Sequence, residues 1–293
     1  MDAGHISDWC TLNLLTRFSL CATSSQFMTV NAQPTLSAEQ DAYLRGRSDW
    51  MGVYLVLHAW GVIALAMAFF IAWPNPLSFV IAVVVIGGRQ LGLAILMHDA
   101  AHRALFKNTW LNDTLGAFLC GWPVGASLSL YRPYHLSHHR HTQQAEDPDL
   151  ILSASFPISP SSFWRKMRRD ILGVTGYQRR MQFFRMEMGD DPSRWQRLRN
   201  LFQAEKYFAL TNLVILVITA AAGVWWAYFA LWLLPLLTWY QVISRIRNIA
   251  EHAVVGDNND RLRNTRTTLT NCCLLYTSPS PRDYAASRMP SSA

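Results

Sequence analysis

Two histidine-rich segments of this chain have the residue types and spacing that bind metal ions. In residues 98–102, His-Asp-Ala-Ala-His, the imidazoles of His98 and His102 are four positions apart and share one helix face, so both can reach one metal. Asp99 stands where a zinc protease of the HExxH type has glutamate, which argues against that class. A single HxxxH pair is a weak signal, because chance pairs are common.

The second segment, residues 135–141, holds four of the nine histidines. His135, His138 and His139 follow the i, i+3, i+4 pattern of a helix face, and the adjacent pair can reach two different metals. A solvated polar loop is the alternative. A third element, Asn248 to His252, again places two side chains four positions apart. By itself it could be a helix-end cation near carbonyl dipoles.

The number of imidazoles bears on the metal. Zinc usually takes four ligands, so one zinc ion would leave several histidines unused. Imidazole suits iron, copper and zinc alike, and a surplus of histidines favours two metals. Iron with open coordination positions can activate O₂, whereas zinc has no redox chemistry. His5 and His58 stand apart from these groups and are interpreted as a tail residue and a packed helix residue.

The elements that must position these groups are membrane helices. Hydrophobic residues make up 51% of the 293-residue chain and charged residues only 15%, against roughly 25% charged in soluble domains. Residues 51–88 and 207–244 carry no Asp, Glu, Lys or Arg. One crossing needs about 20 apolar residues, so each run predicts two helices. We expect them at 51–73, 77–97, 207–222 and 225–244, with a break at Pro74-Asn75-Pro76.

The loop between the two hairpins, residues 103–206, has more Lys and Arg than Asp and Glu, whereas the turn at residues 74–76 has no charge. The positive-inside tendency therefore predicts that this loop and both termini are cytoplasmic. The apolar stretch 115–130 is short and rich in Gly and Pro, and we expect it to be re-entrant or interfacial. All three histidine elements then meet at one membrane face.

Other features exclude several classes. The five cysteines show no disulfide framework and no CxxC metal site, and the net charge of +7 is explained by membrane topology, so neither a secreted protein nor a nucleic-acid partner is expected. Residues 1–50 form a polar N-terminal segment without a clear signal peptide, and Met28 could equally be the true start. The predicted fold is an all-α integral membrane protein with four transmembrane helices in two hairpins and a cytoplasmic helical cap that holds a His-rich di-metal site.

The motifs HDAAH, HLSHH and NIAEH, in this order around two helical hairpins, make residues 51–272 resemble the membrane fatty acid desaturase superfamily. That superfamily also contains hydroxylases and carotenoid ketolases. The resemblance implies a non-haem di-iron centre with six ligands in this chain: His98, His102, His135, His138, His139 and His252. Asn248 matches a position that contacts one iron through water. His141 is expected outside the ligand set, and Asp99, Asp147 and Asp149 can orient ligand histidines.

The resemblance also shows a departure. The superfamily has a further HxxHH element after the NxxxH element, and this chain has no histidine after His252. Residues 273–293 look like a translated sequencing-library adapter rather than native sequence. We therefore expect the desaturase-like region to be incomplete at its C-terminal end and the chain to be inactive as it stands.

The implied reaction is O₂-dependent desaturation of a fatty acyl chain carried as acyl-lipid, acyl-CoA or acyl-carrier protein. A ferredoxin or a cytochrome b5-type protein would supply electrons, and the basic loop suits membrane lipid or an acidic partner. A hydroxylase or ketolase on the same scaffold remains open. A membrane zinc hydrolase would need about three ligands, and a metal transporter would place its ligands within the spans.

Overall fold

The computed structural model describes residues 46–254, and every regular element in that range is helical. In chain order the elements are α2 (Asp49–Ala72), α3 (Pro76–Ala101), α4 (Thr109–Leu115), the π-helix η1 (Gly116–Gly121), the 3-10 helix η2 (Trp122–Val124), α5 (Leu128–His141), α6 (Leu150–Ser153), α7 (Pro160–Ile171), α8 (Val174–Met188), α9 (Arg194–Ala221), the π-helix η3 (Tyr228–Leu233), α10 (Leu234–Leu237) and α11 (Trp239–His252). The expectations for residues 273–293, for Met28 and His5, and for most of segment 1–50 lie outside the described residues.

Four helical stretches are long and apolar enough to cross a membrane. They are Asp49–Ala72, Pro76–Ala101, Arg194–Ala221 and Tyr228–His252. The predicted all-helical fold with four apolar helices is therefore confirmed for the described part of the chain. The stretch 115–130 is not among the candidate spans; it is divided among α4, η1, η2 and the start of α5.

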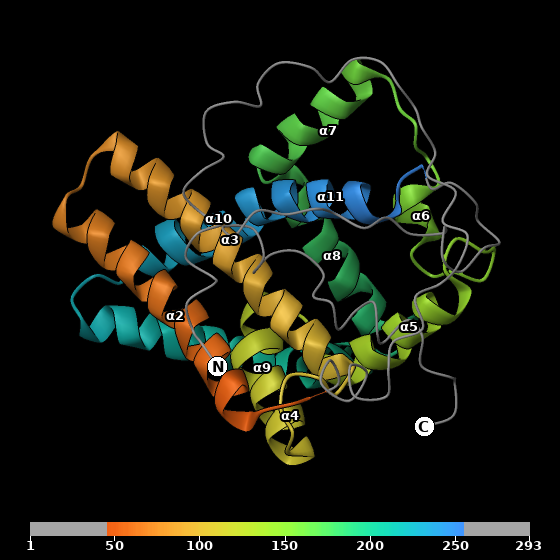
Figure 1. The fold of residues 1–293 in the computed structure, drawn as a ribbon, viewed down its shortest axis with the longest axis horizontal. Coiled ribbons are helices and arrows are strands. Elements are labelled where there is room, and N and C mark those ends of the chain that lie inside the picture. The colour runs from red at the N-terminus through yellow and green to blue at the C-terminus, as the bar shows by residue number, and fades with distance from the viewer. Residues whose placement is uncertain (1–45, 255–293) are drawn as a thin grey trace, which may run out of the picture. The chain divides into compact units, whose positions relative to one another are not determined.

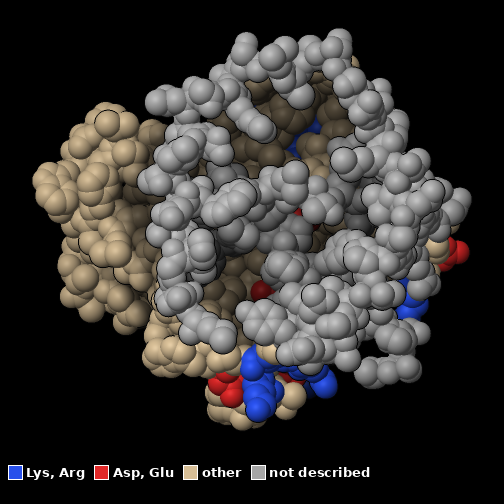
Figure 2. Space-filling model, in the orientation of Figure 1, with Lys and Arg blue, Asp and Glu red and all other residues tan. Residues whose placement is uncertain are grey.

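The first hairpin is formed by α2 and α3, which lie side by side in Figure 1. Asn75 caps α3 by accepting hydrogen bonds from the backbone of Leu77 and Ser78, and Ser78 accepts one from the backbone of Asn75 in return. Pro76 occupies the first helical position, where its missing N–H costs nothing. No charged side chain is visible around this turn in Figure 2, as expected for the end of a membrane hairpin.

The fourth apolar stretch is not the single helix that the sequence predicts over 225–244. It contains the π-helix η3, then α10, and it breaks at Thr238, whose φ and ψ of −115° and −87° are not helical. The side-chain amide of Gln90 in α3 donates to the carbonyl oxygen of Trp232 at 2.8 Å, which supplies a partner within the apolar core. After the break, α11 runs on beside α3 in Figure 1.

The core lies between α2, α3 and η3. It holds the fully buried Ile86, Leu93, Leu231 and Trp232, and the indole ring of Trp232 stacks on that of Trp60 at 5.4 Å. Helix α5 lies at the end of α3 that is away from the α2–α3 turn, whereas α7 lies beside α11 and α8 contacts α10 (Figure 1). Helix α9 begins at Arg194, well before the expected start at Tyr207, because a polar first half continues the same helix.

Candidate metal centre

The first part of the site is the junction between the end of α3 and helix α5. The Arg132 guanidinium donates from Nη2 to the carbonyl oxygen of Ala100 at 2.9 Å and from Nε to that of Ala101 at 3.0 Å. These carbonyls belong to the last turn of α3, where a cation is favourable, and that of Ala100 also accepts from the backbone N–H of Arg103 and from Nδ2 of Asn112. Arg132 also forms an ion pair with Asp113. Because Arg132 is one turn before His135, this clamp fixes which face of α5 meets α3.

Four imidazoles from these two helices converge. His98 lies in the last turn of α3 and His102 at its C-cap, while His135 and His139 share one face of α5. One nitrogen from each of the four lies within 4.8 Å of the others. The Nε2 atom of His135 lies 2.9 Å from that of His102 and 2.8 Å from that of His139. Nitrogen ligands that each lie about 2.0–2.1 Å from one ion are separated by a comparable distance of about 3 Å.

Burial sets the charge of this group. Together with the neighbouring imidazoles, it lowers the pKa of His102 to about 4 and that of His139 to about 2. The pKa of His135 is depressed still more, for the same two reasons. All three are therefore neutral at pH 7, and neutral imidazole is the form that binds metal. The donor set is thus chemically suited to a metal ion.

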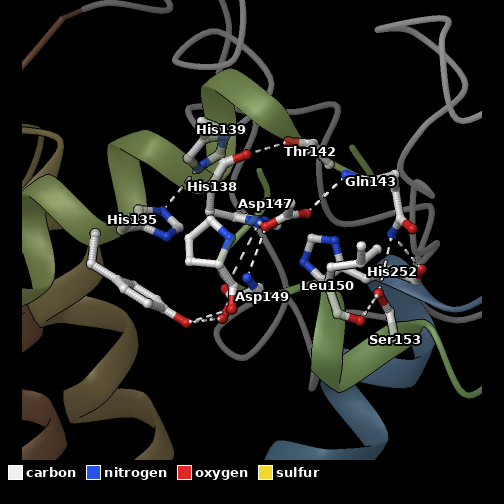
Figure 3. A network of polar contacts seen from close by, with 12 residues as sticks. His135, His138, His139, Thr142, Gln143, Asp147, Asp149, Leu150, Ser153 and His252 are labelled. Atoms are coloured by element: carbon white, nitrogen blue, oxygen red, sulfur yellow. Dashed lines mark hydrogen bonds and ion pairs between the residues drawn. The ribbon is translucent and has the colours of Figure 1, made fainter. Parts of the chain in front are cut away.

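A second group of polar side chains lies beside the first (Figure 3). His138 points away from the α3 side of α5, and its ring centroid lies 4.9 Å from that of His252 on α11. The Nδ1 atom of His138 lies 2.7 Å from Oδ1 of the buried Asp147. Metal-bound imidazoles commonly donate their second N–H to a carboxylate in this way, which leaves Nε2 for the ion. The break at Thr238 allows α11 to bring His252 to this position.

The remaining predicted residues lie around these two groups. Asp99 Oδ1 is 3.4 Å from His98 Nδ1, and Asp149 Oδ2 is 3.8 Å from His138 Nδ1. His141, at the end of α5, has a buried Nδ1 atom with no hydrogen-bond partner among the described residues. Asn248 lies half-buried on α11, one turn before His252. His58, which we interpret as a packed helix residue, lies in α2 with its ring 5.8 Å from that of Tyr54.

Two residues near the histidines were not predicted. The Tyr131 ring stacks on that of His135 at 4.9 Å, and its hydroxyl lies 3.2 Å from His135 Nδ1. Its position four residues before His135 could have indicated this contact. Gln143 donates from its side chain to the carbonyl oxygen of His252 at 2.8 Å and from its backbone to Asp147. No local pattern indicates that second link, which joins segments 109 positions apart.

Comparison with known proteins places the fold and the histidine cluster in a family. Residues 74–277 match the family model described as "Fatty acid desaturase". This match spans from the turn before α3 through α11, so the chain belongs to the fatty acid desaturase family.

Named relatives are also desaturases. The chain is 30% identical to dihydrorhizobitoxine desaturase of Bradyrhizobium elkanii over 224 residues, which is 72% of this chain and 62% of that protein. It is 30% identical to sn-1 oleoyl-lipid 12-desaturase of Anabaena variabilis over 101 residues, 34% of this chain and 27% of the relative. It is 23% identical to sn-1 acyl-lipid omega-3 desaturase (ferredoxin) of a Nostoc strain over 168 residues, 52% and 45% of the two chains. The chain therefore spans less than two thirds of each relative.

Proposed function

We propose that the site belongs to an O₂-dependent desaturase that introduces a double bond into a fatty acyl chain at two iron ions. The observation that carries this proposal is the convergence of four imidazoles from α3 and α5 beside a second pair, His138 and His252. Membership of the desaturase family supports the reaction type.

The two groups of histidines suit two metal positions. The ligands of the first would be His98, His102, His135 and His139, which come from α3 and α5. His138 and His252 would contribute to the second, with Asp147 holding the His138 ring. Asn248 and His141 would lie near the ligands without binding iron directly. Asp99 would orient the His98 imidazole, whereas Asp149, 3.8 Å from His138 Nδ1, would lie near that imidazole without holding it. Bound iron with open positions supplies O₂ activation, which none of the side chains can provide.

The names of relatives support a proposal for the substrate and the electron donor. Relatives are named for oleoyl-lipid and acyl-lipid substrates, and one for ferredoxin, so we propose a fatty acyl substrate and a small redox protein as donor. The protein would be multi-pass in the membrane, with the histidines and both termini on the cytoplasmic side. In support, α3 runs about 33 Å from Pro76 to His98 at 1.5 Å per residue, close to the roughly 30 Å thickness of a bilayer core.

Iron content gives a direct measure for this chain. The chain as given offers six candidate ligands for two ions, and His252 is its last histidine. We expect well under two irons per chain in purified protein, and no desaturation. Two bound irons together with an unsaturated product would show that His141 or another group completes the second position.

The function is tested in a chimera that adds, after Thr270, the segment of dihydrorhizobitoxine desaturase beyond the matched region. Expressed with a ferredoxin and its reductase, the chimera should bind two irons and convert a saturated acyl lipid to a product lighter by two hydrogens. A product with an added oxygen would instead assign a hydroxylase or ketolase. Zinc in place of iron, with ester or amide cleavage, would assign a hydrolase.

A further inference from the structure

Helix α7 presents a basic and apolar face that no described helix covers. Its exposed side chains include Trp164, Arg165, Arg168 and Arg169, with the indole 68% exposed. The helix packs against α11 and α8 and stands at the edge of the described part of the chain in Figure 1. On a helix, positions 164, 168 and 171 or 172 share a face. An aromatic ring, a guanidinium and aliphatic side chains therefore line one outward stripe.

The charge of this face is not neutralised within the described residues. Asp170 is the only acidic residue of α7; it is fully buried and receives Arg245 Nε at 2.5 Å and Nη2 at 2.9 Å. Among the described residues, Arg165 and Arg169 donate only to the neutral Ser162 and Gln178. The four cations Arg165, Lys166, Arg168 and Arg169, here called the basic face, thus make no ion pair with a described carboxylate.

Residues 171–177 comprise the last residue of α7, the short connection and the first turn of α8. This segment is called the elbow. Its exposed side chains are Ile171, Leu172, Val174 and Tyr177, between 38% and 66% exposed. At its other side a Cβ on Gly176 would collide with the carbonyl oxygen of Leu237, and one on Gly173 would lie 3.5 Å from Thr238. The elbow is therefore packed against the middle of the apolar stretch Tyr228–His252.

The depth of the elbow follows from α3. A Cβ on Gly87 would lie 3.0 Å from the ring of Trp239, next to Thr238. Gly87 is about 17 Å along α3 from Pro76, inside a bilayer core of roughly 30 Å. With α3 placed across the bilayer as proposed above, Leu237 and Thr238, and the elbow with them, would lie at hydrocarbon depth. In Figure 1, α7 runs beside α11 from the side of α6 toward that of α10, so the basic face lies farther from α10 than the elbow does. On the proposed placement, the basic face would then lie nearer the cytoplasmic surface of the membrane.

From this arrangement we infer that α7 and the elbow are a lipid-binding element selective for anionic phospholipid. The elbow side chains insert among acyl chains, Trp164 lies at the head-group level, and the basic face binds lipid phosphates. Basic amphipathic helices with an exposed tryptophan bind anionic membranes in this way. The inference rests on the membrane placement proposed above, and it holds whatever the reaction at the metal site.

The test uses the full chain in nanodiscs with equal amounts of phosphatidylglycerol and phosphatidylcholine. A photo-reactive benzoylphenylalanine replaces Leu172, and lipid adducts are identified by mass. Leu65, 70% exposed on α2, is the lipid-facing control site, and Glu146 is the aqueous control. We expect lipid adducts at positions 172 and 65 and none at 146. The ratio of anionic to zwitterionic adducts should be at least about fivefold higher at 172 than at 65, since each cation near an anionic surface contributes about that factor.

The variant Arg165→Gln/Arg168→Gln/Arg169→Gln should lower this ratio to the value at position 65, while the matched Arg→Lys triple variant should retain it. Adducts at 65 but not at 172 would overturn the inference and leave the membrane placement intact. Adducts at neither would overturn the placement itself. Lipid adducts at 172 without anionic preference, or adducts to a protein, would also refute the assignment.

Discussion

Replacement of Asp147 by asparagine tests how the second group of histidines is held. The carboxylate is buried and accepts three hydrogen bonds: Oδ1 receives His138 Nδ1 at 2.7 Å and the backbone N–H of Asp149 at 2.8 Å, and Oδ2 receives that of Gln143 at 2.8 Å. The asparagine side chain would keep one oxygen in the same shape. Its NH₂ group would then face either the backbone N–H of Gln143 or the two groups that donate to Oδ1 in the native protein, His138 Nδ1 and the backbone N–H of Asp149.

The expected cost has two parts. One buried donor loses its acceptor, which destabilises the 142–149 segment by about 1–3 kcal/mol. The His138 imidazole also loses the charged acceptor that fixes its tautomer, and such outer partners contribute about 10–100-fold to metal affinity. We therefore expect Asp147→Asn to weaken binding at the His138 and His252 position about 10–100-fold, with the four-histidine position little changed.

Cobalt(II) titration of the purified full chain, followed by absorbance and by metal content, measures both positions. Asp149→Asn is the matched control, because Asp149 Oδ2 is 3.8 Å from His138 Nδ1 and Oδ1 receives the Tyr134 hydroxyl instead. Its effect on metal affinity should stay within a few-fold. Unchanged cobalt affinity in Asp147→Asn, or a larger loss in Asp149→Asn, would refute the role of Asp147 as the support of His138.

Three further predictions concern the site and its placement. In the chimera, His98→Ala, His135→Ala or His139→Ala should each abolish product and lower iron content, while His58→Ala keeps activity; product at the original rate from any of the first three would contradict the ligand assignment. Burial depresses the pKa of His102 to about 4 and of His139 to about 2, so the unfolded chain binds more protons. The metal-free protein should thus lose stability as pH falls from about 6.5 toward 4, measured by thermal unfolding, and show no such loss above pH 7. Reporter fusions after Met97, Leu150 and His252 should all report cytoplasm and a fusion at Asn75 the opposite side, and an external signal at Leu150 would separate the histidine groups.

The sequence predicted the helices that depend on composition and missed features that depend on contacts. Uncharged runs and the Pro-Asn-Pro turn were enough for α2 and α3, because span length and turn chemistry are local properties. The first half of α9 was missed, since its charged residues hide a helix that continues into the apolar run. The break at Thr238 was missed as well, because a hydropathy pattern does not change where a helix kinks inside an apolar stretch.

At the candidate site, too, the sequence predicted the local features and missed those that depend on tertiary contacts. Spacing alone predicted that His98 and His102 share a face, and that His135 and His139 do. Asp147 is among the carboxylates expected to orient a ligand histidine, but spacing does not predict that its partner is His138, since that depends on how the 142–149 segment folds back. Nor did it predict the Arg132 clamp on α3, because Arg132 bonds to carbonyl oxygens, which every residue type has.

The stability of the α2–α3 hairpin and that of the α5 region should depend on a bound metal to different extents. Helices α2 and α3 satisfy their own backbone hydrogen bonds and bury Ile86 and Leu93 between elements, so their stability does not depend on the site. At the site, by contrast, Nε2 of His135 faces two other Nε2 atoms at 2.8 and 2.9 Å, and one proton cannot satisfy all three. A metal ion bound there would resolve this conflict by accepting all the lone pairs, and its binding energy would then be part of the folding energy of the α5 region. Removal of metal should therefore increase hydrogen exchange in residues 128–153 before it affects the α2–α3 hairpin.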